Sequence, residues 1–202
     1  WACQRFLRDV DREGTDDFPY VFDEEKAVRF LRWMGLFKHT KGKLQGKKIE
    51  PHPIQVFVFG NVYGWAHRET GTRRFRYAYW QVGRKNAKSQ SLACVGSYES
   101  MALGEHMSEV YIGAVKSEQS RIVWKEIKKQ LTDCRDLKGK FRVRYGNIEH
   151  PKSDSIISAL SKDEGQTGDG KNVQCGIVDE YHAHKTSEIL DVLVSGMVAR
   201  TQ

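Results

Sequence analysis

The sequence predicts an α/β fold with a mainly parallel central sheet flanked by helices. From residue 76 onward, short apolar segments typical of strands alternate with longer segments of helical periodicity, and this alternation favours parallel pairing. The chain has 202 residues, of which 39% are hydrophobic and 29% charged, so one domain with a substantial core is expected rather than wholesale disorder. No segment approaches the roughly 18 apolar residues that cross a bilayer, so no membrane partner is expected.

The first part of the chain differs in pattern, and we expect residues 1–50 to form an N-terminal helical and loop appendage to a domain of residues 51–202. Apolar residues at near-helical spacing predict a helix within residues 21–37. A basic, glycine-punctuated run, KHTKGKLQGKKIEPHP, follows at residues 38–53 and predicts a loop or hairpin. Its lysines are interpreted as solvated, with contact to a DNA backbone as the alternative.

The elements of the second part follow in order. Aromatic or β-branched apolar segments predict five strands, at residues 76–82, 109–115, 140–146, 155–161 and 172–178. Apolar residues at helical spacing predict two helices, at residues 89–103 and 116–131. Strands that alternate with helices imply a sheet covered on both faces.

Charge and cysteine content narrow the classes of partner and compartment. Lysine and arginine exceed aspartate and glutamate by 33 to 26, which gives a net charge of +7 and suits a polyanionic partner such as nucleic acid. Basic proteins that bind no nucleic acid are also common, so the charge does not decide. The four cysteines lie far apart, which favours reduced, mostly buried thiols in a cytoplasmic protein over disulfides or a metal site.

The segment QVGRKNAKSQSLA, residues 81–93, has the lysine and serine of a phosphate-binding loop. The formula G-x-x-x-x-G-K-[ST] places glycines six and one residues before the lysine, but Val82 and Ala87 stand there. In such loops the backbone N–H groups face the phosphates, the lysine reaches the β- and γ-phosphate oxygens, and the hydroxyl ligates Mg²⁺. Lys88 is therefore predicted to bind phosphate and Ser89 magnesium. Ala87 is tolerable at negative φ and costly at positive φ.

A second feature supports the first. The apolar segment that ends near residue 178 is followed by Asp179 and Glu180. An ATPase needs an acidic residue at a strand end for the Mg²⁺ shell, which Asp179 supplies, and a group that activates the attacking water, which Glu180 supplies. The two motifs together predict a P-loop NTPase of the ASCE type that uses ATP and Mg²⁺. His182 and His184 form an H-x-H pair, which is interpreted as part of a polar loop rather than as a zinc site.

Several segments, taken together, resemble the ATPase domain of the large terminase subunit of tailed bacteriophages, the motor that packages DNA into capsids. R-K-N-A-K-S resembles the R-K-N-G-K-S of many relatives, and PHPIQVFVFGNVYGW resembles the adenine-recognising segment of that family. IGAVKSEQSRIVWKEI, DEYHAH and SGMVARTQ resemble later motifs in the same order. The resemblance covers roughly residues 50–202.

The resemblance implies roles for several residues. Gln55 would read the adenine edge, and Arg84 would contact the γ-phosphate in the transition state or, alternatively, brace the loop through a salt bridge. An arginine from a neighbouring subunit is a further possibility, with Arg73, Arg74 and Arg121 as candidates. The residues implied to bind the nucleotide in the loop are Gly83, Arg84, Lys85, Asn86, Ala87, Lys88 and Ser89.

The implied activity is ATP hydrolysis that drives translocation of double-stranded DNA into a procapsid. The implied partners are the portal protein, the small terminase subunit and further copies of the chain in a homo-oligomeric ring, in the host cytoplasm. The segment is expected to stop before the ATPase-coupling motif and to lack the nuclease domain, so DNA cleavage is not predicted for it. The alternatives are another P-loop translocase of helicase type, or a basic nucleic-acid-binding domain that does not hydrolyse nucleotide.

Overall fold

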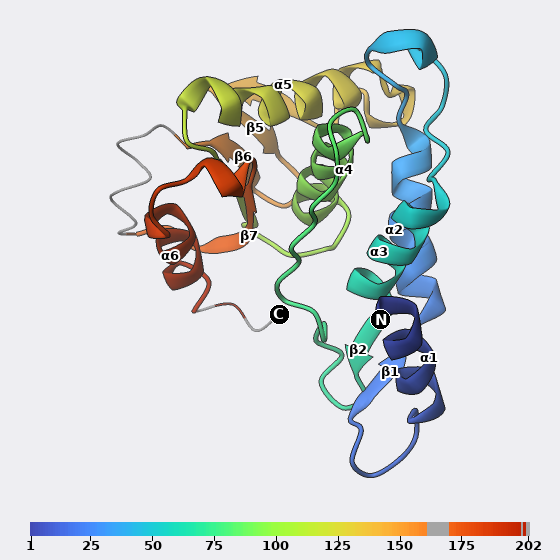
Figure 1. Cartoon of the computed structure of the whole chain (residues 1–202). Helices are drawn as coiled ribbons and strands as arrows, with labels where there is room; N and C mark the ends of the chain where they lie inside the picture. The colour runs from blue at the N-terminus through green and yellow to red at the C-terminus, as the bar shows by residue number, and fades with distance from the viewer. Residues whose placement is uncertain (161–169, 199, 201–202) are drawn as a thin grey trace. The chain divides into compact units, whose positions relative to one another are not determined.

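A computed structural model describes residues 1–160, 170–198 and 200 (Figure 1). The chain divides into two compact units. The first contains residues 1–35 and 50–81, and the second contains residues 36–49 and 82–200. Most of the polar loop predicted between the last two strands, and the end of the segment SGMVARTQ, lie outside the described residues. No described helix is long and apolar enough to span a membrane.

The first unit combines three helices with a short antiparallel ribbon. Its helices are α1 (Ala2–Asp11), α2 (Glu24–Leu36) and α3 (Pro53–Gly64), and its strands are β1 (Tyr20–Phe22) and β2 (Trp65–His67). The predicted helix at residues 21–37 is confirmed as α2, but it begins later because β1 pairs with β2, with Val21 opposite Ala66. The Asp23 side chain then accepts a hydrogen bond from the Lys26 N–H at 3.0 Å, which caps the helix.

The start of helix α3 is stabilised by residues that are local in the sequence. Pro53 occupies the first turn, where its missing N–H costs nothing, and His52 is the N-cap residue. The His52 side chain accepts a hydrogen bond from the Ile54 N–H, and Gln55 Oε1 accepts one from the His52 N–H at 2.8 Å. These reciprocal bonds form a capping box, so Gln55 has a structural role besides the one predicted from the resemblance.

The second unit is built on a five-stranded sheet in the order β4-β5-β6-β3-β7. β3 pairs in parallel with β6 and with β7, whereas β5 runs antiparallel to β6 and to β4. The strands are β3 (Glu109–Gly113), β4 (Arg142–Arg144), β5 (Asn147–His150), β6 (Ser155–Ala159) and β7 (Val173–Val178). The helices are α4 (Lys88–Met101), α5 (Ser117–Asp133) and α6 (Glu188–Ser195). Short 3₁₀ turns lie at Gly42–Leu44, Arg135–Leu137 and Tyr181–Ala183.

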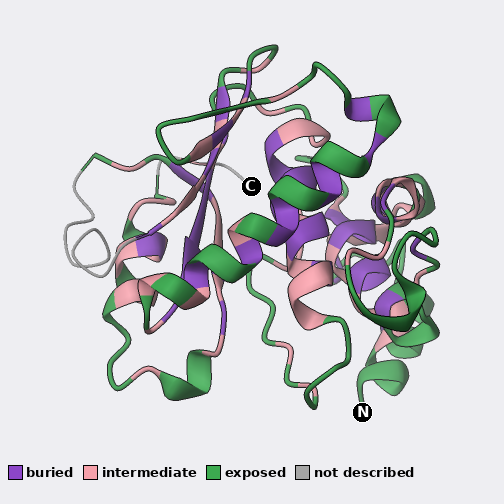
Figure 2. Cartoon of the chain, turned by 90° about the horizontal axis from the view of Figure 1, so that it is seen from above, coloured by how far each residue is buried: buried purple, intermediate pink, exposed green. Residues whose placement is uncertain are grey.

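Helices cover both faces of the parallel part of the sheet. On one face α4 packs so closely that a Cβ on Gly96 would lie 3.1 Å from Ile127 of α5 and 3.2 Å from Ile177 of β7. On the other face a Cβ on Gly176 would lie 3.1 Å from Leu193 of α6. Figure 2 shows the buried residues along the strands and the exposed residues on the outer sides of the helices. The predicted α/β class and two-sided coverage are therefore confirmed.

Three sequence predictions need correction. The strand predicted at residues 76–82 is wrong, because this segment forms no ladder and leaves Tyr77 and Tyr79 exposed by 66% and 71%. Aromatic composition favours strands only where a neighbouring strand and a packing surface are present. The strand predicted at residues 140–146 is only half right, since Tyr145 and Gly146 take φ of +49° and +80° and turn the chain from β4 into β5. Cys3 is exposed, whereas Cys94 and Cys134 are buried as expected.

Candidate active site

The phosphate-loop segment leads directly into α4, whose first residue is Lys88. The N-cap residue Ala87 has φ +54°, and Lys85 has φ +69°, so two non-glycine residues of the loop take the left-handed conformation. Backbone of this kind ahead of a helix forms the anion-binding concavities of phosphate sites. Ala87 therefore has the positive φ at which alanine is costly, at the position where the usual formula has glycine.

The side chain of Asn86 holds the loop in this conformation. Its Nδ2 donates to the carbonyl oxygen of Gly83 at 3.0 Å and to that of Arg84 at 3.4 Å. Asparagine suits this position because its short amide readily bonds neighbouring backbone. Asn86 thus braces the loop from within.

The acidic pair stands at the end of β7, where the loop and this strand end meet. The Asp179 N–H donates to the Gly113 carbonyl of the adjacent β3 at 3.0 Å, which fixes the strand end. Lys88 Nζ lies 3.1 Å from Asp179 Oδ1 and 2.5 Å from Glu180 Oε1. Glu180 has φ +52°, a strained conformation of the kind that clusters at functional sites. The fold thus brings together three residues that the sequence analysis predicted, across a separation of 92 residues.

The contacts among Lys88, Asp179 and Glu180 shift the pKa values of Lys88 and Glu180. Partial burial lowers the pKa of Lys88, but the hydrogen bonds to Glu180 and Asp179 outweigh it, so the pKa lies above its usual value. The hydrogen bond from Lys88 lowers the pKa of Glu180, against a small opposing effect of burial. Electrostatic interactions with Lys88, His182 and Arg84 add to the lowering. At neutral pH the site therefore holds the ammonium group of Lys88 beside the carboxylate of Glu180.

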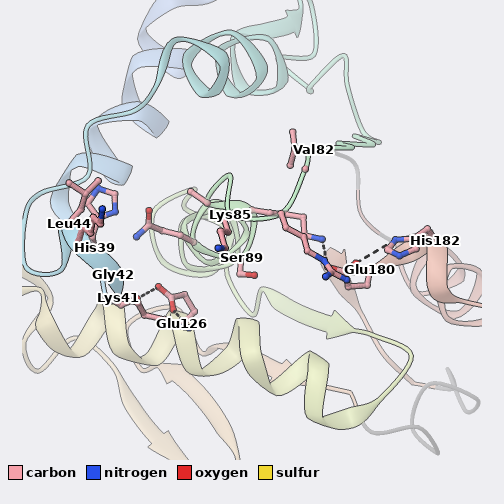
Figure 3. A pocket seen from close by; sticks show the side chains of 17 residues that line it. His39, Lys41, Gly42, Leu44, Val82, Lys85, Ser89, Glu126, Glu180 and His182 are labelled. Atoms are coloured by element: carbon pink, nitrogen blue, oxygen red, sulfur yellow. Dashed lines mark hydrogen bonds and ion pairs between the residues drawn. The ribbon is translucent and has the colours of Figure 1, made fainter.

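A cavity of about 840 Å³ opens beside this triad, large enough for a nucleotide (Figure 3). It is lined by residues 39–44, 82–85 and 87–90, and by Glu126, Glu180 and His182. Asp179 is only 6% exposed and contacts Lys88 but does not line the cavity. Of the implied nucleotide-binding residues in the loop, Asn86 alone is outside the lining as well.

The donor set fits a magnesium ion that is bound jointly with phosphates. Mg²⁺ prefers oxygen ligands and is held by one or two carboxylates together with substrate phosphates and water. Ser89 lines the cavity with its hydroxyl, and the carboxylates of Asp179 and Glu180 stand at the same strand end. In the described part of the chain, no three His, Cys, Asp or Glu residues gather into an all-protein metal cage.

The other predicted residues have mixed outcomes. Gln55 lies on α3 in the first unit, so its adenine role stays a prediction. Arg84 lines the cavity, and its guanidinium forms no ion pair within the described residues, which leaves the loop-bracing salt bridge without support. Arg74 is unsuited to reach another subunit, because its Nη1 is bound to Asp9 Oδ2 at 2.7 Å and its side chain is 18% exposed.

The sequence analysis missed one wall of the cavity. Residues 39–44, which were interpreted as a solvated loop, line it together with Glu126 of α5. Glu126 is 4% exposed and stands on the same helix face as the buried Val123 and Ile127. A carboxylate on an apolar helix face is the signal that could have revealed this contact, because buried carboxylates need partners.

A sheet whose strands β6, β3 and β7 are parallel, an acidic strand end, a lysine at the start of the adjoining helix and a nucleotide-sized cavity define a P-loop NTPase. The model of one family, described as terminase large subunit, ATPase domain, matches residues 53–202. The chain belongs to this family. The predicted resemblance over residues 50–202 is thereby confirmed.

A solved structure supports the same fold. The crystal structure of the HK97 bacteriophage large terminase is similar with a TM-score of 0.71 and 18% sequence identity. The match covers 85% of this chain and 35% of the HK97 chain, so this chain spans about a third of that protein. A comparison with curated protein sequences returned no match.

Proposed function

We propose that the protein hydrolyses ATP with Mg²⁺ and that hydrolysis drives the translocation of double-stranded DNA into a viral procapsid. The observation that carries the proposal is the contact of Lys88 with Asp179 and Glu180 at the edge of a nucleotide-sized cavity. Membership of the terminase ATPase family supports the DNA-packaging part. The net charge of +7 is consistent with a DNA partner.

The proposed roles follow from position and chemistry. The amides of residues 83–89 and the N-terminus of α4 would hold the phosphates, with Lys88 on the β- and γ-phosphate oxygens. Ser89 and Asp179 would hold Mg²⁺, which neutralises charge that develops on the phosphates. Glu180 would orient and activate the attacking water, and Arg84 would stabilise the γ-phosphate charge.

The ion pairs of Lys88 suggest how phosphate binding and catalysis are linked. A phosphate that binds Lys88 competes with both carboxylates for the same ammonium group. When Lys88 turns to the phosphate, Glu180 loses the hydrogen bond that chiefly lowers its pKa, and its carboxylate becomes a better proton acceptor. Substrate binding would thus raise the basicity of the group that acts on water.

The test measures ATP binding and phosphate release, with Mg²⁺ and double-stranded DNA present, for the wild type and for Glu180→Gln. We expect Glu180→Gln to retain ATP binding and to lower kcat by about 10²- to 10³-fold, as for other lost general bases. Glu118→Gln is the matched control, because Glu118 is exposed on α5 and does not line the cavity.

A wild type that does not bind ATP, or a Glu180→Gln variant with unchanged kcat, contradicts the proposal. If double-stranded DNA does not stimulate ATP turnover, the translocation part of the proposal is contradicted, and only the hydrolysis part remains supported. The proposed partners are the portal protein, the small terminase subunit and further copies of this chain in a ring.

A further inference from the structure

A compact basic loop, residues 38–48, forms one wall of the cavity. Its sequence, KHTKGKLQGKK, has five lysines and a histidine and no acidic residue. Its ends are closed by a bridge between Lys38 and Lys48, and the His39 N–H donates to the Lys47 carbonyl at 2.9 Å. Inside the loop, the Gln45 N–H donates to the carbonyl of Gly42 at 3.0 Å. These bonds give the basic loop a defined shape, unlike a solvated linker.

A buried carboxylate fixes this loop beside the phosphate-binding segment. Glu126 of α5 accepts a hydrogen bond from Thr40 Oγ1 at 2.5 Å and pairs with Lys41 Nζ at 3.3 Å. Helix α5 packs against α4, the helix that begins at Lys88. Glu126 is 4% exposed and therefore needs partners, whereas the Lys41 side chain is 72% exposed. The Thr40 hydrogen bond is therefore the main link between the loop and α5, and the Lys41 ion pair adds a weaker one.

The side chains that the loop turns toward the cavity differ from those at the other end. Figure 3 shows His39 and Leu44 at one end, Lys85 and Ser89 in the middle, and Glu180 and His182 at the opposite end. Leu44 is 48% exposed, an apolar side chain within an otherwise polar loop. The cavity therefore runs from an acidic, water-activating end to an end that offers an imidazole, an apolar side chain and the ammonium group of Lys43.

We propose that the basic loop is the nucleoside subsite, in which His39 and Leu44 pack against the base and Lys43 faces the α-phosphate. This inference rests on the proposed function. If the terminal phosphate lies at Lys88 and Glu180, the nucleoside must extend along the cavity toward the loop. Planar and apolar side chains bind the faces of bases regardless of their hydrogen-bonding edges. Glu126 is then a positioning residue that acts through Thr40 and Lys41.

The experiment compares two probes, MgATP and magnesium tripolyphosphate, which share the phosphates and differ in the nucleoside. A His39→Ala/Leu44→Ala variant should weaken ATP binding about tenfold and change tripolyphosphate binding by less than about twofold, because base stacking contributes roughly 1–3 kcal/mol. Lys88→Ala should weaken both probes. Equal loss of both probes, or of neither, in the double variant overturns the inference.

Lysine variants separate a nucleotide contact from a DNA contact. Lys43→Ala should weaken ATP binding, whereas Lys47→Ala, a matched change in the same loop but outside the cavity lining, should not. If both variants instead weaken binding of a DNA duplex equally and leave ATP unaffected, the loop is a DNA contact and the inference is wrong. A wild type that binds neither ATP nor tripolyphosphate contradicts the proposed function itself, so the two failures are distinguishable.

The positioning role of Glu126 is tested separately. Glu126→Gln keeps an acceptor for Thr40 but loses the charge that holds Lys41. We expect KM for ATP to rise about threefold at unchanged kcat, since the groups at the phosphate end are untouched. A fall in kcat with KM unchanged contradicts the positioning role, and a thermal unfolding scan shows that the variant is folded.

Discussion

The two units each contain a cation held by carboxylates, and the two clusters differ in what surrounds them. In the first unit Arg74 pairs with Asp9, and its guanidinium lies over four aromatic rings, at 4.9 to 5.5 Å from their centroids. In the second unit Lys88 pairs with Asp179 and Glu180 beside an open cavity. The rings that enclose Arg74 belong to Phe18, Tyr20, Trp65 and Phe75.

The surroundings of the two ion-pair clusters give them different roles, although both pair a cation with carboxylates. An enclosed pair has no other partner to exchange with, so its removal leaves a buried charge and weakens the fold. In a pair beside a cavity, the cation can leave the carboxylate and bind a ligand. The cation of the second cluster is also of a different kind, since Lys88 carries a compact ammonium group on a flexible chain and Arg74 carries a planar guanidinium. The first cluster is therefore structural and the second exchangeable.

The largest expected effect concerns the enclosed cluster. Arg74→Met should lower the free energy of unfolding by about 3–5 kcal/mol, because Asp9 is left buried without its partner and the cation–π contacts are lost. Urea unfolding followed by tryptophan fluorescence measures this loss. Arg76→Met, at an exposed position two residues away, is the control and should change the unfolding free energy by less than about 0.5 kcal/mol. Equal effects of both changes would contradict the structural role of the enclosed Arg74.

The exchangeable cluster should respond in the opposite way. Lys88→Met should weaken ATP binding about 100-fold, roughly 2.7 kcal/mol, because the phosphates lose their cation. The free energy of unfolding should fall by less than for Arg74→Met, because Glu180 is 38% exposed and water replaces its lost bond. Asp179 is buried and loses the ammonium group as well, but it keeps the hydrogen bond that its Oδ1 accepts from the Glu180 N–H at 3.0 Å. Isothermal titration and urea unfolding of the same sample measure both quantities. A variant that unfolds as readily as Arg74→Met shows that Lys88 is structural.

A smaller effect lies in the loop that carries Lys88. Ala87→Gly should raise the free energy of unfolding by about 1 kcal/mol, because φ +54° strains alanine but not glycine. Ala93→Gly, in the interior of the same helix, is the control and should destabilise by about 1 kcal/mol or more. Thermal unfolding of both variants measures the two signs, and destabilisation by Ala87→Gly contradicts the strained conformation.

The smallest effect is on the pH dependence of stability. The folded-state pKa of Glu180 is lowered from its ordinary 4.5, so its contribution is present above that value and is lost as the pH falls through the lower folded-state pKa. The pKa of Lys88 is raised from 10.5, so its contribution is present below that value and is lost at higher pH. Between these limits the pair should add no pH dependence. Urea unfolding from pH 2 to pH 7 should show a shallower acid limb for Glu180→Gln than for the wild type.

Much of the site could be predicted from residue types and spacing. A lysine and serine at the start of a helix, or two acids after an apolar strand, are each common alone, but together they indicate phosphate and metal binding. Lys88, Asp179 and Glu180 are indeed brought together, as the topology of a parallel sheet requires. The exact loop conformation could not be predicted, since φ at Ala87 depends on how Asn86 and α4 hold the backbone.

The sequence by itself determined the family and the α/β class, and it singled out Lys88, Asp179 and Glu180 as candidates for the phosphate end, because these depend on local periodicity and on motifs that are contiguous in the chain. Only the tertiary structure decided three other features. It left residues 76–82 outside the described strands, enclosed Arg74 among aromatic rings, and placed the basic loop on the cavity that Lys88 lines, through Glu126. The physical reason is that burial and pairing join residues far apart in the chain, and a side chain's sequence neighbours do not report what packs against it.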